Sequence, residues 1–170
     1  MNSRRFLLGA MLVGILFTWA ACRKDDASID EQQIREIYNR YSAAVASKDI
    51  NTIISFYVPG ERLVVFDAFL PRQYVGAAAY RKDYEDFFAN FPGATKSDVS
   101  DLHITTAGTL GFAYGIDHWV VTGTNGPPLE LVLRFTDAFE KVNGNWLITH
   151  EHVSVPVDPM TGKADFLSKP

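Results

Sequence analysis

The sequence has only one cysteine among its 170 residues, Cys22, and it has no long run of lysine and arginine. A single cysteine cannot form an internal disulfide, so the fold must depend on its core. The formal net charge is −4, and all 20 acidic residues follow residue 22. Because the chain lacks the basic surface of nucleic-acid-binding proteins, no nucleic acid is expected among its partners.

Several motifs of well-known enzyme classes are also missing. The chain has no Gly-x-Ser-x-Gly nucleophile elbow, phosphate loop, dinucleotide fingerprint or paired-cysteine metal motif. Covalent catalysis and nucleotide chemistry are therefore disfavoured, and no cofactor is expected. What the chain does have is a composition of 47% hydrophobic and 13% aromatic residues, over a length that suits one domain.

The N-terminus differs in character from the rest of the chain. A pair of arginines precedes an almost unbroken apolar run at 6–21. A membrane-spanning helix needs roughly 20 apolar residues, so this shorter run is interpreted as a signal segment over residues 1–21. The sequence Ala20-Ala21-Cys22 resembles the end of a bacterial lipobox, which predicts a lipid on Cys22 that anchors the protein in the cell envelope, on the periplasmic side of a membrane. The alternative is ordinary signal-peptidase cleavage, which would leave a free thiol near the new terminus.

The remainder of the chain divides into three parts. Residues 22–27 are charged and lack apolar periodicity, which favours a short tether. A folded domain is expected at 28–157, followed by a C-terminal tail at 158–170. The domain begins with a capping-box pattern at Ser28, which predicts the start of the first helix there. The apolar stripe of this helix is expected to consist of Ile34, Ile37, Tyr38, Tyr41 and Val45, which follow at helical spacing.

Hydrophobic spacing predicts helices first and strands afterwards. The expected helices lie at 28–48, 50–57 and 77–90, and the expected strands at 62–66, 98–106, 110–122, 129–142 and 146–155. Asp49 is expected to cap the second helix, and the third has an aromatic stripe of Tyr80, Tyr84, Phe87 and Phe88. Asn143-Gly144 is a strong hairpin signal, because both turn positions need positive φ. Helices followed by a long antiparallel meander indicate an α+β fold. A strongly curved antiparallel sheet with helices on its concave face would enclose a cone-like pocket.

One strand contains an acidic residue in an apolar row. Alternation places on one face of the run 129–142 the residues Leu129, Leu131, Leu133, Phe135, Asp137 and Phe139. A carboxyl without a partner in such a row would be desolvated and its pKa raised. The protonated form of Asp137 could then donate a hydrogen bond at neutral pH.

The order of the elements and a set of short landmark sequences resemble a known family. The landmarks are Arg40-Tyr41, Ala43-Ala44, Lys48-Asp49, Phe66-Asp67, Tyr74-Val75-Gly76, the stretch 144–148 and the stretch 150–156. Over residues 28–157 they resemble the nuclear-transport-factor-2-like superfamily, in its SnoaL-like and ketosteroid-isomerase-like bacterial branch. The resemblance implies a small apolar ligand and a homodimer formed through the outer sheet face. It does not fix the activity, because this superfamily mixes several enzyme classes with non-catalytic binding proteins.

The resemblance also implies roles for three residues. Asp137 matches the protonated aspartic acid of the ketosteroid isomerase oxyanion hole, Tyr41 matches its second hydrogen-bond donor, and Asp67 matches its general base. The implied reaction is abstraction by Asp67 of a proton α to a carbonyl, while Tyr41 and Asp137 stabilise the enolate oxygen. A structural alternative has Tyr41 in the core, Asp67 capping a turn and Asp137 paired with Arg134, Thr136 or a helix terminus. The domain would then be a binding module or a dimerisation module.

Two histidines lie close together near the end of the domain. His150 and His152 alternate onto one face with Trp146, about 7 Å apart, so they could share a metal ion. Neither His103 nor His118 is spaced to provide a third ligand, so no metal site is predicted. The two histidines are instead expected as hydrogen-bonded members of a pocket wall or an interface.

His118 stands in a mainly apolar row of the run 110–122, where a hydrogen-bonded core histidine is expected. It also belongs to the set of candidate ligand-binding residues, which are Tyr57, Tyr74, His118, Trp119, Arg134, His150 and His152.

Overall fold

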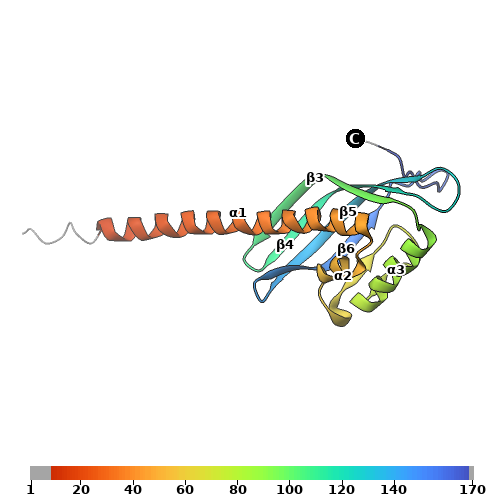
Figure 1. Ribbon diagram of the computed structural model, residues 1–170. Coiled ribbons are helices and arrows are strands. Elements are labelled where there is room, and N and C mark those ends of the chain that lie inside the picture. The colour runs from red at the N-terminus through yellow and green to blue at the C-terminus, as the bar shows by residue number, and fades with distance from the viewer. Residues whose placement is uncertain (1–8, 169–170) are drawn as a thin grey trace, which may run out of the picture.

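The computed structural model describes the backbone of residues 9–168 and the side chains of residues 28–168. The predicted α+β class is confirmed, with the helices before most of the strands (Figure 1). The helices are α1 (Gly9–Ser47), α2 (Ile50–Ser55) and α3 (Ala77–Asn90), with a 3₁₀ turn at Gly60–Arg62. The strands are β1 (Val64–Phe66), β2 (Tyr74–Val75), β3 (Thr95–Ala107), β4 (Leu110–Val121), β5 (Leu129–Val142) and β6 (Asn145–Ser154).

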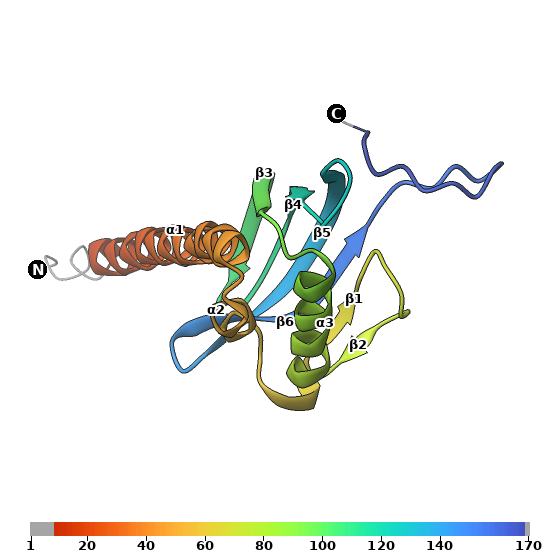
Figure 2. The same ribbon diagram turned by 45° about the vertical axis from the view of Figure 1, so that its right-hand side comes forward.

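The strands form one curved sheet in the order β2-β1-β6-β5-β4-β3. Strands β3 to β6 are the predicted antiparallel meander. The short strand β1 pairs with β6 in parallel, so the sheet is mixed rather than wholly antiparallel. In Figures 1 and 2 the three helices lie on the same side of the sheet, which leaves its other side uncovered by helices.

Helix α1 begins at Gly9, not at Ser28 as the capping-box pattern predicted. No glycine or proline occurs between residues 15 and 47, and the charged segment 22–27 consists of residues that a helix tolerates, so nothing local ends the helix there. The expected signal segment and the lipidation of Cys22 concern residues outside those whose side chains are described. No helix in the described part of the chain is both long and apolar enough to cross a membrane.

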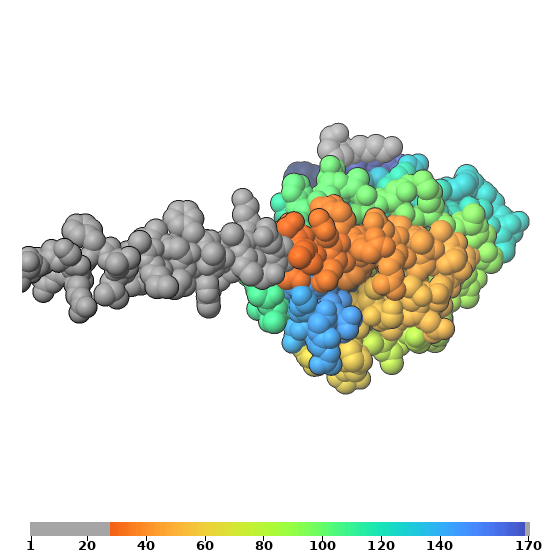
Figure 3. Space-filling model, turned by 60° about the vertical axis from the view of Figure 1, so that its left-hand side comes forward, coloured from red at the N-terminus to blue at the C-terminus, as the bar shows by residue number. Residues whose placement is uncertain are grey.

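From residue 30 onward α1 packs onto the sheet. Ile34 and Tyr38 belong to its buried stripe, as the helical spacing predicted. Asp30 accepts hydrogen bonds from Lys141 Nζ (2.5 Å) and Trp146 Nε1 (3.1 Å), which joins the helix to the β5–β6 hairpin. In Figure 3 the coloured part of α1 lies between β3, in green, and the β5–β6 turn, in blue.

Local sequence signals predicted the cap of α2, the stripe of α3 and the β5–β6 turn, whereas the short strand β2 was not predicted. Asp49 caps α2 by accepting a hydrogen bond from the Thr52 backbone N–H at 3.1 Å. The aromatic stripe of α3 is buried, with Tyr80, Tyr84 and Phe88 in the core. Asn143 and Gly144 form the β5–β6 turn with φ of 51° and 83°, as expected for this dipeptide. The helices therefore stand over the concave side of the meander, and a cavity lies between the two layers.

Candidate functional site

A cavity of about 370 Å³ lies between the helices and the concave face of the sheet. Most of its wall is aromatic or aliphatic, contributed by α1, α3, the strands β3 to β6 and the segments that follow α2 and β1. Six carboxyl side chains also line it: Asp67, Asp83, Asp86, Asp117, Asp137 and Glu151. The volume and the mainly apolar wall are typical of a site for one small ligand, and the carboxyls are the polar groups that would orient it.

The three residues predicted as catalytic all line this one cavity: Tyr41, Asp67 and Asp137. Asp137 is only 2% exposed. Its Oδ2 accepts a hydrogen bond from the Tyr38 hydroxyl at 2.6 Å, while its Oδ1 has no hydrogen-bond partner among the described residues. Burial raises the pKa of Asp137 well above its usual range, and the nearby Glu151 raises it further. The Tyr38 hydrogen bond opposes this rise in pKa, and the net effect of burial is to favour the protonated form of Asp137.

Asp67 lies just after β1 and is partly exposed. Its Oδ1 accepts a hydrogen bond from the Phe69 backbone N–H at 3.1 Å. Burial raises the pKa of Asp67 to about 6, against the opposing effect of the Phe69 hydrogen bond. At neutral pH Asp67 is therefore mostly ionised and able to accept a proton, whereas burial favours the protonated form of Asp137.

Tyr41 does not touch Asp137. Its hydroxyl lies 2.9 Å from the hydroxyl of Tyr84 on α3, in the same cavity. The hydroxyl bonded to Asp137 belongs to Tyr38, which lies nearly one helical turn earlier on α1. The sequence placed Tyr38 only on the apolar stripe of the helix, because a tyrosine on such a stripe is usually a core residue.

Glu151 is the main site residue that the sequence did not predict. Its carboxyl is buried and accepts hydrogen bonds from the hydroxyls of Tyr57 (2.7 Å) and Tyr80 (2.5 Å). Burial raises the pKa of Glu151 to about 7, and the two tyrosine hydrogen bonds oppose the rise. In the β5–β6 register Glu151 lies directly opposite Asp137, so two carboxyls occupy neighbouring positions on the inner face.

A bulge on β6 explains why alternation gave the wrong face. Ile148 pairs with Phe139 and His150 pairs with Ala138, so Thr149 is an extra residue on β6. The extra residue reverses the alternation beyond it. Glu151 therefore shares the inner face with Ile148, although strict alternation predicted that the two residues would lie on opposite faces.

The same bulge turns His150 and His152 to the outer face, away from Trp146, and neither histidine lines the cavity. His150 Nδ1 lies 2.7 Å from the Val64 carbonyl oxygen. Both imidazole rings contact Phe66, with centroid distances of 4.9 and 5.8 Å. A pocket-wall position for these histidines was therefore wrong, and their surroundings are those of the outer sheet face.

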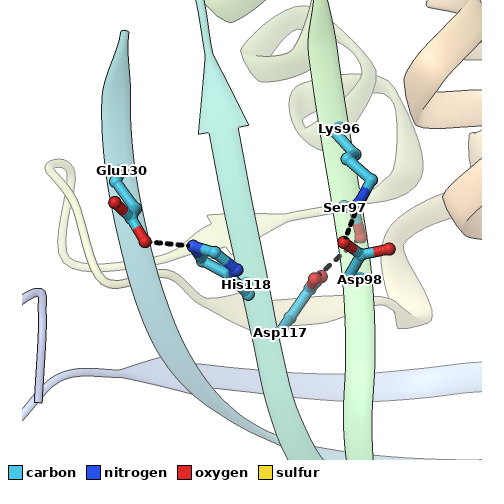
Figure 4. Close-up of polar contacts among 6 residues, drawn as sticks. All are labelled: Lys96, Ser97, Asp98, Asp117, His118 and Glu130. Atoms are coloured by element: carbon cyan, nitrogen blue, oxygen red, sulfur yellow. Dashed lines mark hydrogen bonds and ion pairs between the residues drawn. The ribbon is translucent and has the colours of Figure 1, made fainter. Parts of the chain in front are cut away.

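On strand β4 the residues that face the cavity are not those of the row that contains His118. Asp117 and Trp119 line the cavity, whereas His118 is on the other face. Figure 4 shows Asp117 turned toward Ser97 and His118 turned toward Glu130, whose Oε1 lies 2.7 Å from His118 Nε2. The prediction of a core histidine was wrong, because alternation defines two rows but does not say which one the helices cover.

Asp117 is a further buried carboxyl that the sequence did not single out. It accepts hydrogen bonds from the Ser97 hydroxyl and from Trp119 Nε1, both at 2.7 Å. Burial raises the pKa of Asp117 to about 6 against the effect of these two bonds. The inner row also contains Gly115, where a Cβ atom would lie 3.0 Å from the Phe135 ring. The absence of a side chain at Gly115 therefore allows the Phe135 ring to pack closely against β4 in the cavity wall.

The other predicted ligand-binding residues separate into two groups. Tyr57 and Trp119 line the cavity. Tyr74 and Arg134 do not: Tyr74 donates to Asp83 Oδ1 at 2.5 Å, and Arg134 is exposed on the outer face of β5. Within residues 28–168, no three histidine, cysteine, aspartate or glutamate side chains are grouped so that they could hold a metal ion.

Comparison with known proteins gives a consistent family. The model of the SnoaL-like domain family matches residues 34–158. An NTF2-like protein of unknown function from Pseudomonas putida KT2440 is 30% identical, with a TM-score of 0.75 over 85% of this chain and 99% of its own. An NTF2-like superfamily protein from Salmonella enterica is 20% identical, with a TM-score of 0.70 over 81% of this chain and 99% of its own.

A third similar structure is a candidate dehydratase of the NTF2-like family from Streptomyces avermitilis. It is 16% identical, with a TM-score of 0.68 over 77% of this chain and 99% of its own, and at that identity it shows the fold alone. No curated protein sequence matches this chain.

Proposed function

Since this chain belongs to the SnoaL-like domain family, we propose that it is an enzyme of proton transfer that acts on a small, largely apolar carbonyl compound. The reaction class is isomerisation, cyclisation or dehydration, each of which begins with removal of a proton α to a carbonyl. The observation that carries this proposal is a pair of carboxyls with different surroundings in one cavity. Asp67 is partly exposed and has a pKa of about 6, so it is mostly ionised at neutral pH. Asp137 is buried with one oxygen unpaired among the described residues, and burial raises its pKa well above the usual range.

Each carboxyl has a defined step in this mechanism. The Asp67 carboxylate takes the α proton, and the electron pair of the broken C–H bond moves toward the carbonyl oxygen to form an enolate. The protonated Asp137 donates a hydrogen bond to that oxygen, which is stabilised most when the negative charge is greatest. Asp67 then returns the proton to another carbon, or the enolate expels a leaving group such as hydroxide.

Surrounding side chains support these roles. Tyr38 holds Oδ2 of Asp137, which leaves Oδ1 as the oxygen for a substrate. The paired hydroxyls of Tyr41 and Tyr84 are further donors on the cavity wall. The aromatic wall excludes water, which strengthens a hydrogen bond to the enolate. A carboxylate that can accept a proton and a carboxyl that can donate a hydrogen bond, placed in one cavity, suit the two halves of this step.

The proposal is tested by hydrogen–deuterium exchange at the α carbon of phenylacetone in D₂O, followed by proton NMR. The wild-type protein should accelerate the exchange, and Asp67→Asn should reduce the acceleration by about 10² to 10⁴-fold, as expected for loss of a general base. The amide oxygen that this substitution introduces can still accept the Phe69 backbone hydrogen bond, so the fold should persist. Asp98→Asn, an exposed carboxyl outside this cavity, is the matched control. Exchange that does not depend on Asp67 would instead favour a binding module.

We also propose that the protein is exported and held at the periplasmic side of a membrane by a lipid on Cys22. The support is the apolar run at 6–21 that ends in Ala20-Ala21-Cys22. Expressed in a bacterial host, the wild-type chain should partition into detergent and gain the mass of a lipid. Cys22→Ala should move it to the soluble fraction. Equal partitioning of the two chains would exclude the anchor.

A further inference from the structure

The cavity has an unbalanced set of charges. Six carboxyl side chains line it, and none of the lysine, arginine and histidine side chains at positions 28–168 does so. Asp67 and Asp117 are mostly ionised at neutral pH, since the pKa of each is about 6. One of the six, Asp86, is ion-paired with Lys82, which lies outside the lining. No salt bridge joins Asp67 or Asp117 to a cationic side chain among residues 28–168, so these two carboxylates give the wall negative charge without a paired cation.

The buried carboxyls of Asp117 and Glu151 accept their hydrogen bonds from neutral groups. Asp117 accepts from Ser97 and Trp119. Glu151 accepts from two tyrosine hydroxyls, at 2.7 and 2.5 Å. Such donors orient a carboxylate and partly replace its hydration, but they add no positive charge. Each ionised carboxyl therefore repels the others through a poorly solvated space.

An independent observation indicates that a ligand completes this site. Asp137 is 2% exposed, and its Oδ1 has no hydrogen-bond partner among the described residues. Buried polar atoms are nearly always paired, so an unpaired oxygen on a cavity wall indicates a position for a polar atom of a bound molecule. In the proposed reaction this atom is the carbonyl oxygen of the substrate.

The aromatic walls suit a cation as well. Trp119 lies between Tyr41 and Phe87, with ring centroid distances of 6.5 and 5.5 Å. All three rings line the cavity. The Asp117 carboxylate lies beside them and accepts a hydrogen bond from Trp119 Nε1. Ring faces attract cations, most strongly where water is excluded. The same faces give no favourable interaction to an anion.

We propose that the ligand of this cavity is an organic cation, a compact apolar molecule that bears a protonated nitrogen in addition to its carbonyl group. The ammonium group would lie against Asp117 and the aromatic rings beside it, while the carbonyl oxygen faces Asp137. This inference rests on the proposed function, because it assigns a charge to the substrate of the same site. Carboxylates and phosphates are rejected, since they would bring a further negative charge into an acidic, poorly solvated space.

The test uses three probes with a common skeleton and different charge: phenethylamine, 2-phenylethanol and phenylacetate. Dissociation constants are measured by isothermal titration calorimetry at neutral pH and low salt on the full chain in detergent, with NMR shifts of the Trp119 indole N–H reporting the location. We expect phenethylamine to bind about tenfold or more tightly than the alcohol. Phenylacetate should bind most weakly. The proposal is overturned if the alcohol or the carboxylate binds as tightly as the amine, or if the amine does not bind at millimolar concentration.

A pair of matched variants separates cavity charge from overall charge. Glu151→Gln removes an ionisable carboxyl from the cavity and should reduce the preference for amine over alcohol several-fold. Glu85→Gln makes the same change on an exposed part of α3 outside the cavity and should leave the preference unchanged. An equal effect of both substitutions would indicate attraction by net charge alone and would contradict a cation site.

The outcome can be distinguished from failure of the proposed function. If phenylacetone exchange depends on Asp67 but the amine has no advantage, the enzyme acts on neutral carbonyl compounds and only the cation inference is wrong. If the amine binds with the expected preference but no exchange is seen, the cavity is a cation-binding site without proton-transfer activity. The two experiments therefore report on different properties of the same cavity.

Discussion

Asp137 on β5 and Glu151 on β6 lie directly opposite each other, and both carboxyls are buried on the inner face of the sheet. Two carboxyls at adjacent positions disfavour simultaneous ionisation. Their hydrogen bonds differ, because Glu151 accepts from two tyrosines and Asp137 from one. The proton that is held to higher pH therefore belongs to Asp137, and this asymmetry underlies the predictions below.

The first prediction concerns the hydrogen bond between Tyr38 and Asp137. Tyr38→Phe should lower the free energy of unfolding by about 1 to 3 kcal/mol, because it leaves a buried carboxyl without its donor. It should also raise the pKa of Asp137 further, since the Tyr38 bond opposes the shift. Urea denaturation and carbon NMR of the Asp137 carboxyl measure the two effects. Tyr41→Phe removes a hydroxyl from the same cavity but not from Asp137, so an equal effect on the Asp137 signal would contradict the pairing.

The second prediction concerns stability against pH. The folded-state pKa of Glu151 is about 7, above its usual 4.5, so the folded protein binds more protons than the unfolded chain in this range. Stability should therefore fall as pH rises from about 5 to 8, with Glu151 contributing about 3 kcal/mol of the loss.

Glu151→Gln should make this decline shallower without abolishing it, because Asp67 and Asp117 also have raised pKa values. The exposed Glu85→Gln should keep the wild-type slope. Denaturant unfolding at a series of pH values measures both variants. A wild-type slope in Glu151→Gln would show that its carboxyl titrates in the folded protein as it does in the unfolded chain.

The third prediction concerns the pH dependence of α-proton exchange. The rate should rise as pH passes about 6, where Asp67 becomes ionised, and fall at higher pH where Asp137 loses its proton. The pH profile of kcat/KM for phenylacetone exchange measures this. Asp117 also titrates near 6, so Asp117→Asn is the informative variant. The rising limb should remain in Asp117→Asn, and its loss would assign the limb to Asp117.

The fourth prediction concerns self-association. Phe112 and Tyr114 are each 45% exposed on the outer face of the sheet, and His103 stacks on Tyr114 at 4.9 Å. Exposed aromatic residues that lie together favour an interface. We predict a homodimer through this face, which Tyr114→Lys should convert to a monomer in analytical ultracentrifugation. Ala89→Lys, on an exposed position of α3, should remain dimeric. A wild-type monomer at micromolar concentration would exclude the interface.

Much of the fold was predictable because its signals are local. The aromatic stripe of α3, the Asp49 cap of α2 and the Asn143-Gly144 turn each depend on residues a few positions apart. The same holds for the strands of the meander, whose bounds differ from the expected ones by a few residues. The start of α1 was wrong, because the pattern at Ser28 suits a helix start but does not require one.

The candidate site was predictable only in part. Asp137 was found because an acid in an apolar row is visible in the sequence, and Tyr41 and Asp67 followed from the family resemblance. Tyr38 was missed because its contact with Asp137 joins residues 99 positions apart. Glu151 was missed because one extra residue, Thr149, reverses the alternation of β6.

The sequence by itself determined the helices, the meander and the presence of a buried acid, since propensity, capping and turn chemistry act between near neighbours. The tertiary structure alone decided which face of β4 and β6 meets the helices, and so which carboxyls share the cavity. Alternation along a strand defines two faces without ranking them, and a single bulge exchanges them. The acidity of the site is likewise a tertiary property, because the pKa values of Asp67, Asp117, Asp137 and Glu151 shift only after folding removes these carboxyls from water.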